Sequence, residues 1–393
     1  MPFQYFKEEL RRHQLRRTPS NDAFAYAESI NFLVAEHWDL ASQSAGVFFR
    51  RSYLQTLETH PPEGVQFRYA LIYREARPIA AVVIQVLRAD LSRLVPASSP
   101  LAAGGRLIQQ KLVVCGSLHC WGNQGVAFAP GIDPASVWPS VAEVLYGMRR
   151  ADKLHGETDF VLFRELPAGD ASAQCLKDYG YQPVDIEPDM LLDLKNWTCW
   201  DDYLNSLQSK YRKSAKAILS KTEKAGCQLL KLHDLEPHRA NIEQLYRSVW
   251  ANADVRPVTL SPNYLIALNS ALGDDYAFLA LFQGERMIGY VTALRSDQVC
   301  VGFVIGFDRQ AAEGVPIYLR LLYAVVEQAL TWKCTSISFG GSALEPKAAL
   351  GCHAQPAQVW VRHRIAPLNA LIGPLLGSFS PQQPPERNPF KQA

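Results

Sequence analysis

The feature that most constrains the fold of this chain is an internal repeat. The apolar segment 69–73 is followed by a polar four-residue turn ending in Arg and by a longer apolar segment, 78–86. The apolar segment 278–282 is followed by a similar turn, also ending in Arg, and by the apolar segment 287–294. Two apolar runs joined by a short polar turn predict a β-hairpin. The sequence therefore predicts one hairpin in each half of the chain.

The similarity between the halves continues downstream of both hairpins. Residues 137–153 and 315–333 place apolar side chains at helical spacing. A short apolar strand, a short helical stretch ending in Gly180 or Gly351, and a last apolar strand then follow in each half. The order hairpin, helix, strand, helix, strand thus occurs twice, which indicates a duplication. Mixed strands and helices of this kind predict an α/β or α+β fold, with two tandem domains that are each a mixed sheet flanked by helices.

The repeat also predicts the domain boundaries. We expect an N-terminal domain over residues 1–195 and a C-terminal domain over residues 196–378, because a new unit begins near Trp197. The remaining residues, 379–393, are rich in Pro and Gln and predict a poorly ordered tail.

The composition narrows the classes of protein that fit. The chain has 393 residues and is 48% hydrophobic, which suffices for two ordinary cores. Its net charge is +2, so a site for a polyanion has to be a local patch. The 8 cysteines are scattered without a CxxC pair, which is typical of buried thiols in a reducing compartment. The apolar runs are too short for a membrane span or a signal peptide, so we expect a cytoplasmic protein.

One short segment carries side chains that can bind zinc. Cys115, His119 and Cys120 are potential ligands, but the adjacent His119 and Cys120 fit one tetrahedron poorly, and no fourth ligand follows at a standard spacing. We therefore expect no metal site. A Walker loop, a GxSxG motif and an HExxH motif are also absent from the sequence, so nothing favours an ATPase, a lipase-like hydrolase or a zinc protease.

Three local motifs support a resemblance to a known family. The segment 176–181 ends in a Gly-aromatic pair, the segment 209–226 is strongly basic, and Phe339-Gly-Gly precedes Lys347 by a few residues. With the order of elements, these motifs resemble the tandem-domain branch of the GNAT N-acyltransferase superfamily. That branch includes the FemAB-like acyltransferases and the Fem-type aminoacyltransferases of peptidoglycan bridges. The resemblance implies transfer of an acyl or aminoacyl group to an amine, without a permanently bound cofactor.

The resemblance also locates the donor site. The basic segment and the Gly-Gly to Lys347 element lie in the second half and have no counterpart in the first. We therefore expect the C-terminal domain to bind the donor and the N-terminal domain to be the degenerate copy. One stretch departs from the family: residues 306–316 lack the Gly-rich spacing that holds the pyrophosphate of acetyl-CoA at a helix N-terminus. This departure favours another thioester or an aminoacyl-tRNA ester as donor.

The basic segment has two readings. Tyr211, Ala215, Ile218 and Leu219 form an apolar stripe at helical spacing, so the cations lie on the opposite side. In the functional reading, Lys210, Tyr211, Arg212 and Lys213 contact the phosphates of a donor or of tRNA. In the other reading the cations form a solvated helix face. The cations of the segment are Lys210, Arg212, Lys213, Lys216, Lys221 and Lys224, beside the acid Glu223.

Further candidates concern the chemical step. Tyr318, on the predicted central helix, is the candidate proton donor to the leaving group, and Asp308 is a candidate to orient or deprotonate the amine. Gly302 or Gly306 would mark a bulged strand whose backbone N–H stabilises the oxyanion. Each also has a plain structural reading, as a core-edge tyrosine or a loop carboxylate.

The last candidates belong to the Gly-Gly element. Gly340 and Gly341 follow an apolar strand and would let a ligand approach the backbone, while Lys347 would bind its phosphate or carboxylate. The alternative is a surface lysine beside a turn.

Three functions remain open from the sequence. The first is an N-acyltransferase that uses acyl-CoA or an acyl carrier protein and acts on a small metabolite or peptide amine. The second is an aminoacyl-tRNA-dependent ligase of the Fem type. The third is a non-catalytic GNAT-like binding module, since fold alone does not decide function.

Overall fold

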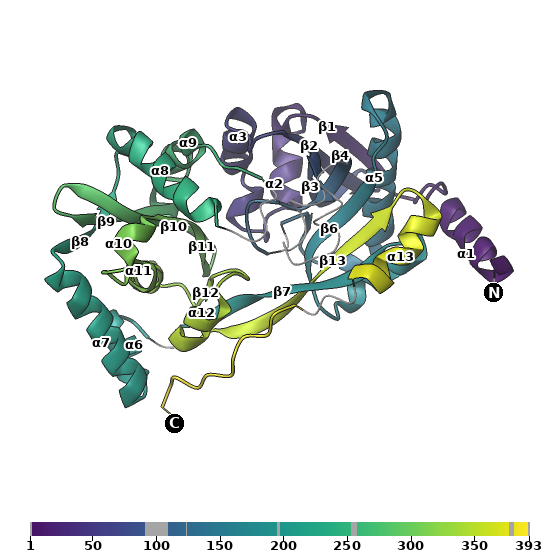
Figure 1. Ribbon diagram of the computed structural model, residues 1–393. Coiled ribbons are helices and arrows are strands. Elements are labelled where there is room, and N and C mark those ends of the chain that lie inside the picture. Colours follow the sequence, from purple (N-terminus) through teal and green to yellow (C-terminus); the bar gives the residue numbers. More distant parts are fainter. Residues whose placement is uncertain are drawn as a thin grey trace. The chain divides into compact units, whose positions relative to one another are not determined.

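Both predicted hairpins are present in the computed structural model. The structure describes residues 2–90, 109–122, 124–194, 197–252, 258–376 and 381–391. The chain forms two units (Figure 1). Unit 1 comprises Met1–Glu187, Val255–Thr259 and Pro356–Pro381, and unit 2 comprises Pro188–Asp254, Leu260–Gln355 and Gln382–Ala393.

Unit 1 contains a mixed sheet with strands in the order β1-β2-β3-β4-β6-β13, and β5 pairs with β3. The hairpin β2–β3 is antiparallel, whereas β4 and β6 are parallel. The strands are β1 (Ala23–Ala27), β2 (Val65–Arg74), β3 (Arg77–Asp90), β4 (Gln109–Cys115), β5 (Val126–Phe128), β6 (Phe160–Pro167) and β13 (His353–His363). The helices are α1 (Pro2–Leu15), α2 (Ala35–Ala41), α3 (Arg51–Thr59), α5 (Trp138–Ala151), the 3-10 helix η7 (Ala171–Tyr179) and α13 (Ala366–Leu376).

The strands of unit 2 pair in the order β7-β12-β11-β10-β9-β8 and are also mixed in direction. The hairpin β9–β10 is antiparallel, and β11 and β12 are parallel. The strands are β7 (Gln182–Asp193), β8 (Cys227–Leu232), β9 (Tyr276–Gln283), β10 (Arg286–Ser296), β11 (Val299–Phe307) and β12 (Ser336–Ser338). The helices are α6 (Trp200–Ser206), α7 (Ser209–Lys224), α8 (Arg239–Trp250), α9 (Pro262–Leu272), α10 (Arg309–Ala312), α11 (Ile317–Thr331) and α12 (Leu344–Leu350).

The predicted repeat is present in the order of the elements. Each half runs from a hairpin to a long helix, a parallel strand, a short helix and a last strand, through α5 and β6 in one half and α11 and β12 in the other. The structure adds a third antiparallel strand after each hairpin, β4 and β11, before the long helix. The predicted mixed α/β class is therefore confirmed.

The last strand of each half pairs with the other half of the sequence. At its end, β7 pairs with β12 through Leu191–Asp193, whereas β13 pairs with β6 through Ala357–His363. The units consequently divide between Glu187 and Pro188 and take in segments from both halves. Lys195, where the sequence halves were expected to meet, lies outside the described residues. The predicted ranges 1–195 and 196–378 stay a prediction about the repeat.

Part of the segment expected to be a tail, residues 381–391, is described by the structure. This segment belongs to unit 2, where Phe390 forms a β-bridge with Leu207. The Phe390 ring lies 5.1 Å from the Trp197 ring, and the Lys391 N–H donates to the Ser206 carbonyl at 2.9 Å. An aromatic anchor thus fixes a proline-rich segment that lacks helical or strand periodicity.

The two faces of the unit 2 sheet are covered by different helices. A Cβ added at Gly289 would meet Ile317 and Leu321 of α11. The side chain of the next residue, Tyr290, points to the opposite face of the sheet, because successive side chains of a strand alternate. There Gly306, the cross-strand partner of Tyr290, packs against the backbone of Leu245 in α8. Helix α11 lies between the sheet and helices α6 and α7. This position explains why most of its side chains are apolar and buried. In the described ranges, no helix combines the length and hydropathy needed to cross a bilayer.

Candidate functional site

The parallel strands β11 and β12 of unit 2 separate soon after they meet. They pair at Val299–Val301 and Ser336–Ser338, and no further pairs follow within the described residues, although β11 continues to Phe307. Gly302 lies where the strands part, and a Cβ there would be 3.3 Å from the Phe339 ring. The end of β12 and the second half of β11 thus diverge from a shared point.

A β-bulge follows at this point of β11. Val291 pairs with Ile305 and Ala293 pairs with Gly302, so Thr292 alone lies opposite two residues of β11. The Thr292 hydroxyl accepts a hydrogen bond from the Val304 N–H at 2.9 Å. The bulge expected near Gly302 or Gly306 is therefore present between them. Gly306 itself is required by packing, since a Cβ there would lie 2.6 Å from the Tyr290 ring.

Tyr318 lies in the first turn of α11, which follows β11 after the short helix α10. Its ring is 6.1 Å from the Phe307 ring, and its side chain is half-buried. Burial raises the pKa of Tyr318 to about 12, so the phenol stays protonated at neutral pH. Its hydroxyl has no hydrogen-bond partner among the described residues. Tyr323 differs: it is buried in the core with its ring 5.3 Å from the Trp200 ring.

Asp308 has a structural role that the sequence did not reveal. Its carboxylate accepts the N–H groups of Gln310 and Ala311 at 2.9 and 3.2 Å, and thereby caps α10. It also forms an ion pair with Arg286. Because the carboxylate already accepts these hydrogen bonds and faces a guanidinium, the geometry favours capping over proton abstraction by Asp308. The region 306–316, where acetyl-CoA users hold pyrophosphate, is occupied here by α10 and its cap.

Lys347 is placed differently from the expectation. It is 2% exposed, and its ammonium donates to the carbonyls of Phe339 and Gly340 at 2.7 and 3.0 Å. A lysine buried in this way braces the turn after β12, and it is not the surface residue that either reading of the sequence described. Gly340 has a φ of +72°, a conformation that favours glycine, and Gly341 is buried beside it.

Asp189 is a residue that the sequence analysis missed. It lies on β7 in unit 2 and accepts hydrogen bonds from the Ser338 hydroxyl at 2.6 Å and from the Gly340 N–H at 2.8 Å. Burial raises the pKa of Asp189 above its ordinary value. The hydrogen bonds from Ser338 and Gly340 lower this pKa, but the effect of burial is larger. The one available signal was an acid directly before the apolar run 190–192.

The basic segment forms helix α7 as expected. Tyr211, Ala215 and Ile218 pack against the core of unit 2, and the buried Thr222 continues this face. Arg212 is half-buried, and no cation of α7 forms an ion pair with any residue that the structure describes. The helix therefore carries uncompensated positive charge. The exposed cations are Lys210, Lys213, Lys216, Lys221 and Lys224.

The Cys115–Cys120 segment forms a hydrogen-bonded cluster in unit 1. The His119 ring is 2.8 Å from the Ser117 hydroxyl and 3.0 Å from the Tyr53 hydroxyl. Burial lowers the pKa of His119 to about 3. No group of three metal-binding side chains occurs among the described residues, and all 8 cysteines are free thiols.

The fold is shared with known tandem proteins. The structure is similar to a tandem GNAT protein from the clavulanic acid biosynthesis pathway, with a TM-score of 0.51 and 12% sequence identity over 87% of this chain and 98% of that one. It is also similar to FemX, with a TM-score of 0.50 and 10% identity over 81% of this chain and 96% of FemX. The class is therefore a tandem GNAT fold, as the sequence motifs suggested.

A sequence family supports the same class. Residues 209–347 match the family described as an acetyltransferase (GNAT) domain, a span that begins with α7 and ends at Lys347. No curated protein matches the chain in sequence. Residues 209–347 are therefore similar in sequence to an acetyltransferase (GNAT) domain, and the whole chain shares the tandem fold.

Proposed function

We propose that the protein is an N-acyltransferase that moves an acyl group from a thioester, either acyl-CoA or an acyl carrier protein, to the amine of a small metabolite or peptide. The reaction takes place in unit 2, at the end of the β11–β12 pairing. The observation that carries this proposal is the position of Tyr318: a protonated phenol without a described partner, in the first turn of α11 and beside Phe307, the last residue of the bulged strand β11.

The proposed chemistry uses one proton donor and the backbone. The amine attacks the thioester carbonyl, so that a C–N bond forms and a tetrahedral oxyanion develops, which the backbone of β11 at the bulge stabilises. The C–S bond then breaks, and Tyr318 donates its proton to the leaving thiolate. The tyrosinate recovers a proton from the nitrogen, which loses one on becoming an amide. Protons therefore balance without a further reagent.

Donor binding is the second part of the proposal. Lys210, Tyr211, Arg212 and Lys213 contact donor phosphates from the start of α7, where the cations lack ion pairs. Gly306, Gly340 and Gly341 shape the backbone along the donor. Lys347 supports this part from beneath, by holding the Phe339 and Gly340 carbonyls.

The test is a turnover assay with defined donors. Purified protein is incubated with acyl-CoA thioesters of several chain lengths and a mixture of amines, and products are identified by mass spectrometry. We expect amide formation that requires the amine and that Tyr318→Phe slows strongly. Donor binding without any turnover across the donor and acceptor panels would instead favour a non-catalytic module.

A second candidate is an aminoacyl-tRNA-dependent ligase, and the uncompensated charge of α7 favours it. A row of unpaired cations suits a phosphate backbone as well as a single nucleotide. Brief ribonuclease treatment of the donor fraction separates the candidates: it abolishes transfer from tRNA and leaves transfer from a thioester unchanged.

A further inference from the structure

Three arginines lie near the turn that ends η7 in unit 1: Arg12, which is paired with Glu8 and Glu9, and Arg16 and Arg362. Gly180 occupies this turn with a φ of +86°, and a Cβ there would lie 3.0 Å from Nη1 of Arg16 and 3.7 Å from Cδ of Arg362. Arg16, which follows α1, donates to the Tyr179 carbonyl at 2.7 Å. Arg362 comes from β13, so segments far apart in the sequence bring the two side chains together.

Aromatic rings hold the guanidinium groups of this cluster. The Arg362 guanidinium lies 5.7 Å from the centre of the buried Tyr181 ring, and Arg149, near the end of α5, lies 5.2 Å from the Tyr146 ring. Stacking on an aromatic face orients a guanidinium and leaves its in-plane N–H groups available.

None of these arginines makes an ion-pair contact with a carboxylate among the described residues, although the charges of Glu9 and Glu157 lie near enough to act to raise the pKa values of Arg16 and Arg149. Arg362 is 4% exposed, and its Nε has no hydrogen-bond partner. Arg16 and Arg149 are half-buried. Burying a charged group without a partner is strongly unfavourable.

The nearby carboxylates bind other cations. Glu9 is 2.8 Å from Arg12, and Glu157 is 3.1 Å from Lys153. Burial, followed by the charge of Arg362, lowers the pKa of Arg16 to about 10 and also lowers the pKa of Arg149. The charge of Arg362 thus acts on both Arg16 and Arg149, and Glu9 and Glu157 oppose its effect.

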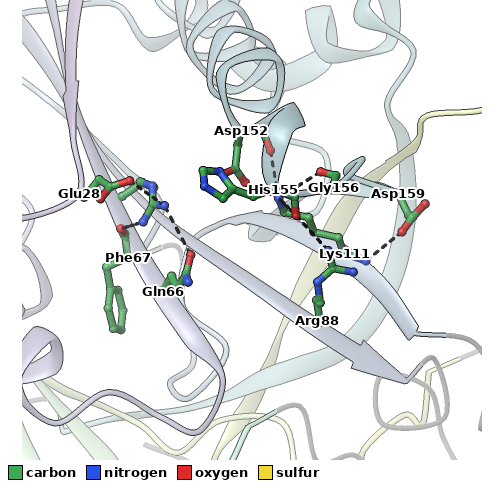
Figure 2. Close-up of polar contacts among 10 residues, drawn as sticks. Glu28, Gln66, Phe67, Arg88, Lys111, Asp152, His155, Gly156 and Asp159 are labelled. Atoms are coloured by element: carbon green, nitrogen blue, oxygen red, sulfur yellow. Dashed lines mark hydrogen bonds and ion pairs between the residues drawn. The ribbon is translucent and has the colours of Figure 1, made fainter.

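Lys111 shows what a compensated buried cation looks like in the same unit. It is 4% exposed, and its ammonium lies 2.5 Å from the Asp152 carboxylate (Figure 2). The carbonyl of Gly156 accepts a further hydrogen bond at 3.2 Å. Lys111, on β4, thus holds the segment between α5 and β6 in place. Among the described residues, no carboxylate makes an equivalent contact with Arg16, Arg149 or Arg362.

We propose that Arg16, Arg149 and Arg362 form an anion-binding site in unit 1 that takes a phosphate group. A phosphate offers several oxygens to several guanidinium groups at once and carries up to two negative charges. It matches a cluster of three cations better than a single carboxylate does. The free ion and the phosphate group of a larger molecule share this chemistry.

The test measures anion binding to the full chain. Calorimetry and thermal unfolding are recorded with sodium phosphate and with phenyl phosphate, against sodium chloride at matched ionic strength. We expect phosphate to raise the melting temperature and chloride to leave it unchanged. Equal affinity for both phosphates indicates a site for the free ion, and tighter binding of phenyl phosphate indicates a site for a phosphomonoester.

Matched variants on α5 localise the site. Arg149→Gln is expected to weaken phosphate binding at least about tenfold, and to melt no lower than wild type without phosphate because it relieves repulsion. Arg150→Gln changes the exposed neighbour and should bind phosphate like wild type. Arg362→Met is a second variant, which removes the buried cation. The proposal is overturned if phosphate and chloride act alike, or if Arg149→Gln and Arg150→Gln have the same effect on phosphate binding.

Discussion

The Asp189 carboxylate accepts the hydroxyl proton of Ser338 at a distance of 2.6 Å, and this contact ties the end of β12 to β7. The same carboxylate accepts the Gly340 N–H, while Lys347 binds the Gly340 carbonyl. The turn after β12 is thus held by a carboxylate and by an ammonium at the place where β11 and β12 part.

Asp189→Ala should destabilise the protein by about 1–3 kcal/mol, because two largely buried donors lose their acceptor. Asp189→Asn keeps one acceptor oxygen and should lose less. Urea unfolding at pH 7.5 measures both changes. If Asp189→Ala unfolds at the same urea concentration as wild type, the carboxylate does not hold the turn.

Tyr318→Phe should lower kcat about a hundredfold, the lower end of the range for a positioned general acid, with little change in melting temperature. The loss should shrink for an activated aryl thioester, whose leaving group departs without protonation. Tyr323→Phe is the matched control, since the Tyr323 ring packs against Trp200 in the core. An equal loss of kcat in both variants would contradict the assignment of Tyr318 as proton donor.

The sequence predicts the elements that repeat and the helix faces that are amphipathic. The hairpins, the two long helices and the apolar stripe of α7 each follow from spacing within one segment. The pairing of β7 with β12 and of β13 with β6 does not follow from spacing within one segment. The last strands of the two halves have similar apolar patterns, and their pairing depends on contacts between residues distant in sequence.

The site residues show the same limit. Tyr318 falls on the expected helix, whereas Lys347 and Asp308 differ from their expected environments because their partners come from other elements. Burial of Lys347 depends on carbonyls after β12, and the role of Asp189 depends on a strand pairing that the sequence does not encode locally. Residue type and spacing identify candidates, and tertiary contacts decide which of them are accessible.

The charges at the start of α7 allow a test of donor binding. The double variant Arg212→Gln with Lys213→Gln should melt within a few degrees of wild type, because neither the half-buried Arg212 nor the exposed Lys213 forms an ion pair with a described residue, and solvent-accessible charges contribute little to stability, typically under about 1 kcal/mol each. Its affinity for the donor should fall at least about tenfold at low salt, and the difference should shrink as salt rises. Lys231→Gln with Lys333→Gln, two exposed lysines outside α7, is the control of equal charge. Donor affinity equal to wild type at low salt would leave α7 as a solvated helix face.

The His119 cluster predicts how stability depends on pH. The pKa of His119 in the folded state is lowered to about 3 by burial, whereas an unfolded chain protonates histidine near its ordinary value of 6.5. Between these values the unfolded state binds more protons, so the free energy of unfolding falls as the pH decreases from about 6.5 towards 3. One such group contributes at most about 1.4 kcal/mol per pH unit. His119→Gln should therefore lose less stability than wild type between pH 7 and pH 5, measured by urea unfolding at both values. The exposed His155→Gln controls for histidine content and should follow wild type. If His119→Gln and wild type lose stability in parallel, His119 does not fold as a neutral, buried group.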